Sequence, residues 1–408
     1  MPQGGAREGA GRNPLAPELK KKDYKIYLNE EQYADIIRYG EGNSFSAKVM
    51  DMLMAEMDRR KAKRYNYKFI DLFAGVGGFH LALEKYGNEC VFASEIEPHC
   101  QKVYEKNFGM IPAGDITKIA AKDIPDFDIL TAGFPCQPFS YAGKLEGFED
   151  KTRGTLFFDI LRIIKEKKPK MFLLENVKGL KSHQKGETLN TIITCLEKAG
   201  YTVYWDILNS HDFGVPQKRE RWYCVGFDKA IPFTFPKGTN NKTTLKDIVD
   251  IELDDPKLRL SEFELERIRH HFASDEIRVQ HDNSKYDPNT KKGKYGVFSF
   301  LKPDKTLRFH IGDAAKTQIQ EAYYCSLDSV APAIIVAREP KLWDLERRLS
   351  VDECRRLQGF PENFILDESE VQAKRQMGNS IALPVVEAIS KAMLEAYTSQ
   401  VEKEEIND

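Results

Sequence analysis

The sequence predicts an α/β protein with a doubly wound, mainly parallel sheet and a second, smaller domain. From Tyr67 onward, short apolar runs alternate with helical segments, an order typical of a parallel sheet covered on both faces. This alternation disappears from about Ile231 to Arg338, which favours a smaller domain of mixed, irregular structure, and it returns near Glu353. The 408 residues, 41% of them hydrophobic, are enough for two or three domains with a substantial core.

Six strands are expected in the sheet, with helices between them and one long helix near the end of the chain. The strands are KFIDLF (68–73), CVFASEI (90–96), FDILTAG (127–133), MFLLENV (171–177), TVYWDIL (202–208) and WYCVGF (222–227). The helices are FHLALEKYG (79–87), HCQKVYEKNF (99–108), LFFDILRIIKEKK (156–168), TLNTIITCLEKAG (188–200) and residues 383–395. The helical segments carry apolar residues at helical spacing, whereas the strands are short continuous apolar runs.

The first 64 residues differ from the rest in composition. Residues 1–22 are rich in Gly, Pro and basic side chains and predict a flexible arm. Residues 23–64 predict a strand at Tyr24 to Leu28 and two helices. Asn29 is expected to cap the first helix, with Gln32 at the capping-box position, and Ser44 to cap the second.

A strand and two helices in about 40 residues bury too little apolar surface to be stable alone. This segment is therefore expected to self-associate or to dock on the larger domain. Its order resembles the ribbon-helix-helix family, in which paired strands from two chains enter the DNA major groove. The resemblance implies that Lys25 or its strand neighbours face bases.

Composition excludes several classes of protein. The sequence has no run of eighteen apolar residues and no apolar stretch of the kind a signal peptide needs, so we expect a soluble, cytoplasmic protein without membrane contacts. Its seven cysteines are scattered without a CxxC pair, so we expect reduced thiols and no zinc. The net charge is only −2, so a nucleic-acid surface must be local; residues 280–310 hold 7 Lys and Arg against 3 Asp and Glu.

Polar side chains follow the expected strands at the edge where ligands bind in an open α/β sheet. A glycine-rich turn with Gly75 and Gly77 follows the first strand, and the second strand ends at Glu95, the right place for a carboxylate that binds ribose hydroxyls. Asp115 ends the next segment and could accept a hydrogen bond from an adenine amino group. These groups fit an adenosine without a pyrophosphate; the alternative is that both carboxylates only cap helices.

The stretch TAGFPCQPFSYAGK brings Cys136 to the same edge, between Pro135 and Pro138, which limit the backbone freedom of its loop. The simpler reading of Cys136 is a small buried hydrophobic residue. The strand MFLLENV places Glu175 at the next strand end, and a carboxylate there is costly unless it is paired or functional.

In VPQKRERWY, Arg219 and Arg221 stand two residues apart, on one side of an extended segment. Charges that flank a strand are usually solvated. The site beside these two arginines favours a functional role instead.

Several long motifs together resemble one family. They are FIDLFAGVGGF, GFPCQPFSYAGK, RGTLFFDI, LLENVKGL, VPQKRERWY, RRLSVDECRRLQGFPENF and RQMGNSIALPV. In this order they are similar to the cytosine-C5 DNA methyltransferases, over residues 66–395 apart from a variable stretch near 231–340. The resemblance implies the fold of S-adenosylmethionine-dependent methyltransferases.

The resemblance also implies the chemistry. Carbon 5 of cytosine is a poor nucleophile, so the thiolate of Cys136 adds to carbon 6 first. Glu175 contacts ring nitrogen 3, and a raised carboxyl pKa helps it to donate. Arg219 or Arg221 supplies positive charge that lowers the pKa of the thiol. S-adenosylmethionine then gives its methyl group to carbon 5. His270, His271 and His281 could in principle bind a metal ion, but the chemistry needs none.

The resemblance implies an S-adenosylmethionine site in which Phe73 packs on the adenine and Glu95 binds the ribose. Its expected residues are Phe73, Gly75, Gly77, Glu95, Ile96, Asp115, Ile116, Pro135, Asn379 and Ser380. The target cytosine must be rotated out of the duplex to reach the thiol. The segment from Gly143 to Thr155 resembles the mobile loop that closes over DNA, and Gln137, Ser140 and Lys144 are expected DNA contacts.

The chain is therefore divided into a flexible basic arm (1–22), a ribbon-helix-helix-like extension (23–64), a catalytic domain (65–230), a target-recognition domain (231–345), a return to the catalytic domain (346–400) and an acidic tail (401–408). The first hypothesis is a DNA cytosine-5 methyltransferase, the modification half of a bacterial or phage restriction system. Its partners would be duplex DNA and, genetically, a cognate restriction endonuclease. The alternatives are a tRNA cytosine-5 methyltransferase, and a methyltransferase that also regulates transcription through residues 23–64.

Overall fold

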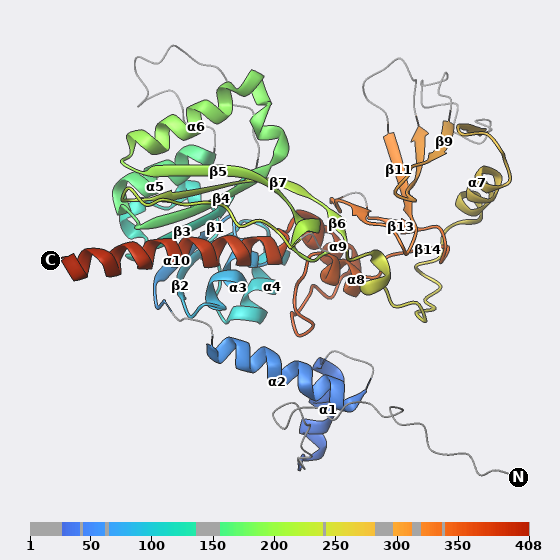
Figure 1. Cartoon of the computed structure of the whole chain (residues 1–408), viewed down its shortest axis with the longest axis horizontal. Helices are drawn as coiled ribbons and strands as arrows, with labels where there is room; N and C mark the ends of the chain where they lie inside the picture. Colours follow the sequence, from blue (N-terminus) through green and yellow to red (C-terminus); the bar gives the residue numbers. More distant parts are fainter. Residues whose placement is uncertain are drawn as a thin grey trace, which may run out of the picture. The chain divides into compact units, whose positions relative to one another are not determined.

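The computed structural model describes residues 27–40, 44–61, 65–135, 156–239, 242–281, 297–311, 320–336 and 339–407. The chain forms two compact units, Met1–Arg60 and Lys61–Asp408 (Figure 1). The larger unit contains both sheets. No helix of the described residues is long and apolar enough to cross a membrane.

The first sheet has six strands in the order β2-β1-β3-β4-β7-β5. They are β1 (Lys68–Leu72), β2 (Glu89–Ser94), β3 (Ile129–Gly133), β4 (Met171–Val177), β5 (Thr202–Asn209) and β7 (Glu220–Phe227). β1 to β4 run parallel, and β7 lies antiparallel between β4 and β5. All six predicted strands are confirmed. The carboxyl ends of the four parallel strands meet at one edge, which is where the site forms.

Helices cover both faces of this sheet (Figure 1). They are α3 (Gly78–Glu84), α4 (Pro98–Phe108), α5 (Leu156–Lys167), α6 (Glu187–Lys198) and α10 (Leu383–Asn407). Side chains of β4 alternate between two cores: Met171 and Leu173 pack with the core of α3 and α10, whereas Phe172 and Leu174 pack with the core of α5 and α6. The predicted doubly wound α/β fold is confirmed. The final helix is longer than expected and includes most of the predicted acidic tail.

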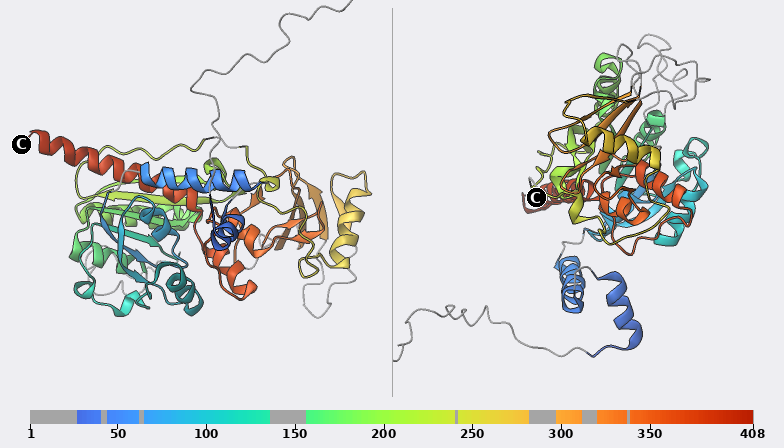
Figure 2. Two further views of the ribbon diagram at one scale, coloured as in Figure 1. Left: turned by 90° about the horizontal axis from the view of Figure 1, so that it is seen from below. Right: turned by 90° about the vertical axis from the view of Figure 1, so that its right-hand side faces the viewer.

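A second sheet occupies much of the stretch that lacks a regular sequence pattern. Its order is β14-β13-β11-β10-β9-β8. The strands are β8 (Val279–His281), β9 (Val297–Leu301), β10 (Leu307–Ile311), β11 (Gln320–Cys325), β13 (Lys341–Leu342) and β14 (Arg347–Arg348). Helix α7 (Glu262–Phe272) lies beside it (Figure 2), and Ile268 packs with Leu307 and Phe309. We call residues 258–348 the second lobe, and residues 65–239 with 351–407 the first lobe.

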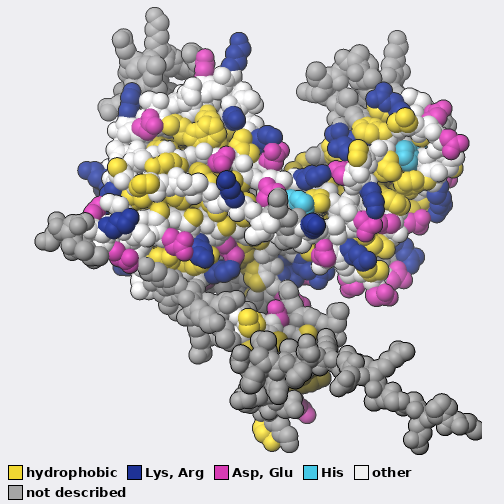
Figure 3. Space-filling model, viewed as in Figure 1, with side chains coloured by type: hydrophobic (Ala, Val, Ile, Leu, Met, Phe, Trp, Pro, Cys, Tyr) yellow, Lys and Arg dark blue, Asp and Glu magenta, His cyan; other side chains and the backbone are white. Residues whose placement is uncertain are grey.

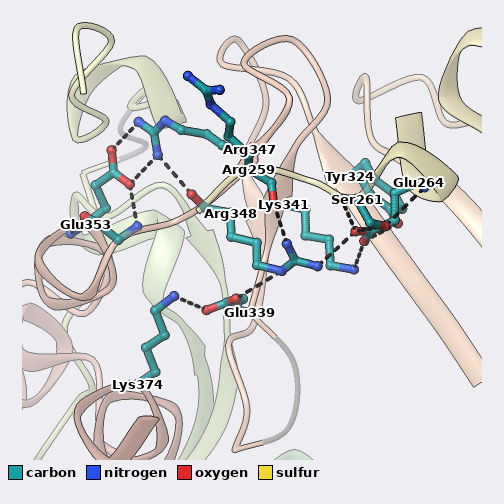
Figure 4. A network of polar contacts seen from close by, with 11 residues as sticks. Arg259, Ser261, Glu264, Tyr324, Glu339, Lys341, Arg347, Arg348, Glu353 and Lys374 are labelled. Atoms are coloured by element: carbon teal, nitrogen blue, oxygen red, sulfur yellow. Dashed lines mark hydrogen bonds and ion pairs between the residues drawn. The ribbon is translucent and has the colours of Figure 1, made fainter. Parts of the chain in front are cut away.

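Two short helices, α8 (Val351–Leu357) and α9 (Glu370–Asn379), return the chain to the first lobe. Polar contacts join the lobes there (Figure 4). Arg347 of β14 binds Glu353 of α8 through two contacts of 2.7 and 2.8 Å. Short 3-10 turns complete the described elements: Ile116–Lys118, Ala121–Asp123, Lys178–Lys181, His183–Gly186, Ser210–Phe213 and Leu245–Asp247. A small sheet pairs β6 (Gln217–Lys218) with β12 (Ala331–Pro332).

The smaller unit contains α1 (Glu30–Tyr39) and α2 (Phe45–Lys61). The predicted capping box between Asn29 and Gln32 is present, with contacts of 2.8 and 3.1 Å, and Ser44 accepts from the N–H of Ala47 at the start of α2. Both predicted helix starts are confirmed. Of the expected strand at Tyr24 to Leu28, only the last two residues are described, and they are not in a strand.

Candidate active site

The end of β2 is fastened to the glycine-rich turn after β1. Glu95 Oε2 accepts from the N–H of Gly75 (2.8 Å), and Oε1 accepts from the N–H groups of Ile96 and Glu97, each at 2.9 Å. Gly75 has a φ of +55°, and a Cβ atom there would meet no described atom within 4 Å. The turn therefore needs glycine for its backbone, and it leaves open space beside a fixed carboxylate.

Apolar and polar groups expected around an adenine lie at the same edge. Ile96 directly follows Glu95 and is 70% exposed, which is unusual because isoleucine side chains are mostly buried. Asp115 caps a 3-10 turn by accepting from the hydroxyl (2.7 Å) and the N–H (3.1 Å) of Thr117, which lowers the pKa of Asp115 and favours its charged form. A backbone bond from Ala113 to Ala93 of β2 (2.8 Å) keeps this segment beside the sheet.

The last two residues of α9 and the residue after them, which we call the turn 378–380, close this part of the site. A Cβ at Gly78 would lie 2.5 Å from Ile381 Cγ1, so the glycine-rich turn and the segment after Ser380 are in close contact. Asn379 is exposed and Ser380 is half-buried at the end of α9. Phe73 lies at the start of the glycine-rich turn, and its backbone is in the left-handed region, with a φ of +55°. The structure thus brings the two predicted parts of the cofactor wall together.

Glu175 lies at the end of β4, opposite Gly133 of β3. Its Oε2 would be 3.5 Å from a Cβ at Gly133, so the carboxyl group sits over the last residue of β3. Arg221 Nε is 3.3 Å from Glu175 Oε1. Burial raises the pKa of Glu175, although the positive charges of Arg221 and then Arg219 oppose this. A carboxyl group with a raised pKa can act as a proton donor near neutral pH.

Asn176 connects this carboxyl group to Phe134, two residues before Cys136 in the sequence. Its Nδ2 donates to the carbonyl oxygen of Phe134 (2.9 Å), and it is 1% exposed. The described chain stops at Pro135, the residue bonded to Cys136. The remaining predicted residues of this loop, Cys136, Gln137, Ser140 and Lys144, lie outside the described residues, as does the segment from Gly143 to Thr155.

The two predicted arginines occupy different surroundings. Arg221 pairs with Glu175, whereas the buried guanidinium of Arg219 donates to backbone carbonyl oxygens, among them that of Ser380 (2.5 Å). Burial, and then the like charge of Arg221, lowers the pKa of Arg219 to about 9. Arg219 therefore contacts the wall of the site rather than the Glu175 carboxyl group.

Sequence reasoning missed two groups of residues at this edge. Lys178, Lys181 and Lys185 follow β4 and line a pocket of about 670 Å³ together with Gly179 and Ser182. Their signal was available, since three lysines follow Glu175 within ten residues. Gln217 and Gln358, both fully buried, bind each other beside Arg219. Gln217 stands two residues before Arg219, just as Arg219 stands two residues before Arg221. The alternation of side chains in an extended segment therefore places all three on one side, and this spacing was a signal for Gln217.

The three histidines that the sequence offered as metal ligands, His270, His271 and His281, do not form a metal centre. His271 Nδ1 and His281 Nε2 each lie 2.7 Å from the Ser299 hydroxyl, and His270 Nε2 lies 3.2 Å from the carbonyl oxygen of Gln280. Within the described ranges no group of three His, Cys, Asp or Glu side chains could hold a metal ion.

The chain is similar to known proteins over most of its length. Residues 67–395 match the family model described as C-5 cytosine-specific DNA methylase. The Type II methyltransferase M1.ScrFI of Lactococcus lactis subsp. cremoris is 43% identical in an alignment of 401 residues that covers 92% of this chain and 94% of that protein. The Type II methyltransferase M.SsoII of Shigella sonnei is 37% identical over 409 residues, covering 94% of this chain and 99% of that protein.

A structural comparison supports the fold. The crystal structure of the S. pombe Dnmt2 methyltransferase matches with a TM-score of 0.57 and 21% identity, over 81% of this chain and 98% of that chain. Residues 67–408 are 342 of the 408 residues, so the two sequence alignments that cover 92% and 94% of the chain extend into the residues before 67. The extension is therefore at least partly shared with these relatives.

Proposed function

The chain belongs to the C-5 cytosine-specific DNA methylase family, and on that premise we propose that it transfers a methyl group from S-adenosylmethionine to carbon 5 of cytosine in duplex DNA. The observation that carries this proposal is the meeting of two groups at one sheet edge. The Glu175–Arg221 pair lies at the end of β4, near Phe134, which precedes Cys136 by two residues. The Glu95–Gly75 contact joins the ends of β2 and β1 at the same edge, and β3 lies between β1 and β4.

In the proposed reaction, the sulfur of Cys136 bonds to carbon 6 of the cytosine while Glu175 donates a hydrogen bond to ring nitrogen 3. The raised pKa of Glu175 suits that donation, and Arg221 orients the carboxyl group. S-adenosylmethionine supplies an electrophilic methyl group for carbon 5. Loss of the carbon 5 proton then releases the thiol. A base accepts this proton.

The residues present fit S-adenosylmethionine. Glu95 is fixed by three backbone N–H groups, and its remaining lone pairs suit ribose hydroxyls. Ile96 offers an exposed apolar surface for the adenine, and Asp115 offers a charged acceptor. The open space at Gly75 leaves room for the ligand close to the backbone. Phe73, Ile116, Asn379 and Ser380 would complete the wall.

A cytosine stacked in a duplex hides the face that the thiol must attack, so the proposed mechanism includes rotation of the base into the site. The pocket lined by Lys178, Lys181 and Lys185 suits the DNA backbone beside such a base. Lys178 is paired with Glu220, whereas Lys181 stands over the half-exposed ring of Trp205, 5.7 Å from its centroid. Figure 3 shows a hollow between the two lobes, with Lys and Arg side chains along it.

By analogy with the Type II methyltransferases M1.ScrFI and M.SsoII, we propose that the protein is the modification enzyme of a restriction-modification system in the bacterial cytoplasm. It would then protect a short DNA target from a cognate endonuclease. The second lobe would read that target from the groove.

The test compares labelled-methyl transfer from S-adenosylmethionine to duplex DNA and to tRNA. Transfer to cytosine in duplex DNA is expected, and Cys136→Ser should abolish it. Transfer to tRNA alone would replace the DNA proposal with the tRNA alternative. Near-normal DNA transfer by Cys136→Ser would remove Cys136 from the proposed role.

A second function is favoured for residues 23–64. Among their described side chains none is buried, and several apolar ones are exposed, including Tyr33 (52%), Met50 (55%) and Leu53 (47%). A unit with so little core gains stability by covering this apolar surface, and we propose that a second copy of the chain covers it. A dimer of this kind could bind DNA at a promoter.

Comparison of the full chain with a chain that begins at residue 65 tests this second function. The full chain should be a dimer by light scattering, and it should bind DNA more tightly. The shortened chain should be monomeric and still methylate DNA. A full chain that is monomeric and binds DNA no more tightly than the shortened chain would refute it.

A further inference from the structure

A buried cluster binds both backbone polar groups of one residue of the second lobe. Ile334 lies two residues after β12. Its N–H donates to Gln217 Oε1 (3.0 Å), and its carbonyl oxygen accepts from Arg219 Nη1 (2.8 Å). Gln217 is 0% exposed and Arg219 is 3% exposed, so water does not compete for these contacts. The position of Ile334 is therefore set by side chains from β6 and the residue that follows it.

The same guanidinium reaches the turn that closes the cofactor wall. Arg219 Nη2 donates to the carbonyl oxygens of Gly378 (3.2 Å) and Ser380 (2.5 Å). These two residues flank Asn379. One planar group thus binds segment 331–336 of the second lobe and the turn 378–380, which the fork geometry of arginine permits and a lysine would not.

Gln358 also binds this part of the chain, from a different side than Arg219 does. Its Nε2 donates to the carbonyl oxygen of Met377 (2.6 Å), and its Oε1 accepts from Gln217 Nε2 (3.1 Å). Gln217 Nε2 also donates to the carbonyl oxygen of Leu357 (3.0 Å). Both glutamines are fully buried, so losing the Met377 or the Leu357 contact would remove a hydrogen-bond partner from a buried backbone carbonyl group.

An independent observation places the same two segments in contact. A Cβ atom at Gly378 would lie 2.7 Å from the carbonyl carbon of Ile335 and 2.8 Å from the nitrogen of Val336. Backbone atoms of this kind cannot move aside as a flexible side chain would. The absence of a side chain at Gly378 therefore lets segment 331–336 approach the turn 378–380.

We propose that Gln217, Arg219 and Gln358 are positioning residues that fasten the turn 378–380 to segment 331–336 and thereby set the affinity for S-adenosylmethionine. They act through Asn379 and Ser380 rather than on the reacting atoms. The proposal rests on the proposed function, because it takes that turn as part of the S-adenosylmethionine site. It assigns roles to two glutamines outside the predicted site.

Two variants disturb the turn 378–380 from different sides. If one of them fails to fold, the other still tests the proposal. Gln358→Met removes the three hydrogen bonds of the amide, to Met377, Ser380 and Gln217, without changing volume much. Gly378→Ala pushes the two segments apart. The control is Asn88→Leu, which also removes a buried amide that bridges two backbone groups, Leu83 O (2.9 Å) and Tyr67 N (3.1 Å), at the opposite end of β2. The measurement is the Kd for S-adenosylmethionine by calorimetry, with kcat at saturating S-adenosylmethionine.

Both test variants should raise the Kd about tenfold, the scale expected when a buried hydrogen bond is lost, and should change kcat by less than about twofold. Asn88→Leu should lower the Tm but keep the wild-type Kd. An unchanged Kd in the folded test variants, or an equal rise in the control, would overturn the proposal. Arg219→Lys adds a further check: a loss confined to kcat, with the KM for S-adenosylmethionine unchanged, would place Arg219 at the reacting atoms instead.

The outcome also separates this proposal from the proposed function. A wild-type protein that neither binds S-adenosylmethionine nor methylates DNA overturns both. A wild-type protein that does both, while Gln358→Met and Gly378→Ala keep its affinity, overturns the positioning role alone.

Discussion

Glu353→Gln should be strongly destabilising. Glu353 of α8 is 0% exposed and binds Arg347 of β14 through both oxygens, at 2.7 and 2.8 Å; the Arg347 side chain is 5% exposed. Glu353 also accepts from the N–H groups of Ser350 (2.7 Å) and Asp250 (3.0 Å). The amide of glutamine leaves the guanidinium buried without a counter-charge. Losing one partner of a buried pair costs about 3 to 5 kcal/mol, so we expect that loss in the free energy of unfolding.

The stability of the wild type at acid pH should also depend on the Arg347–Glu353 pair. Burial by itself would raise the pKa of Glu353, but hydrogen bonds from Arg347 and the Ser350 N–H hold it below its ordinary value of 4.5. A group with a lowered folded-state pKa stabilises the fold above its unfolded pKa, and that stability is lost as the pH falls through the folded pKa. The wild type should therefore lose stability below about pH 4.5 more steeply than Glu353→Gln does.

Urea unfolding of the wild type and Glu353→Gln at pH 7 and pH 4 measures both effects. The control is Glu262→Gln, which breaks an ion pair with Arg269 whose side chains are 67% and 57% exposed. Exposed pairs contribute at most about 1 kcal/mol, so this control should change little. A loss in Glu353→Gln no larger than in Glu262→Gln would refute the reasoning.

Three further predictions concern single sites. Glu175→Gln should lower kcat by about 10² to 10⁴, and the wild-type rate should fall as the pH rises through the raised pKa of Glu175, because the donating form is lost; a flat pH profile would contradict this. Burial raises the pKa of Asp71 well above its ordinary value, and its Oδ2 has no partner among the described residues, so Asp71→Asn should have a higher Tm than the wild type at pH 9 but not at pH 5; parallel Tm curves would contradict it. Lys181→Gln with Lys185→Gln should weaken DNA binding for all sequences and reduce the slope of log K against log salt by about 1 per lost phosphate contact; an unchanged slope would remove this pocket from the DNA surface.

The strands and strand ends of the first sheet could be predicted because their signals are local. Apolar runs such as MFLLENV are buried on both faces and end in a carboxylate, and Glu175 and Glu95 both lie at the predicted edge. The helix starts at Asn29 and Ser44 were equally local, since capping depends on residues three positions apart.

The second sheet could not be predicted in the same way. β13 and β14 have two residues each, too few to show alternation, and β11 pairs with β13 across a gap of fifteen residues. The length of α10 was also missed, because polar residues such as Glu404 look the same in a tail and in an exposed helix. Its ion pair with Lys229 (2.5 Å) joins residues far apart in sequence.

The contacts of the buried cluster at the site could not be predicted from the sequence either. Gln217 binds Gln358, 141 positions away, and nothing at either position distinguishes a buried amide from a surface one. The sequence pairs Arg219 with Arg221 as positive charges near the thiol of Cys136, and that role stays a prediction. The contacts of Arg219 with carbonyl groups appear only when three distant segments meet.

Bisulfite sequencing of a duplex DNA library treated with the purified protein and S-adenosylmethionine tests the central claim most directly. The account predicts that one short recurring sequence carries a protected cytosine, and that the Cys136→Ser protein protects none. A wild-type protein that binds S-adenosylmethionine but leaves every cytosine of the library unprotected would contradict it.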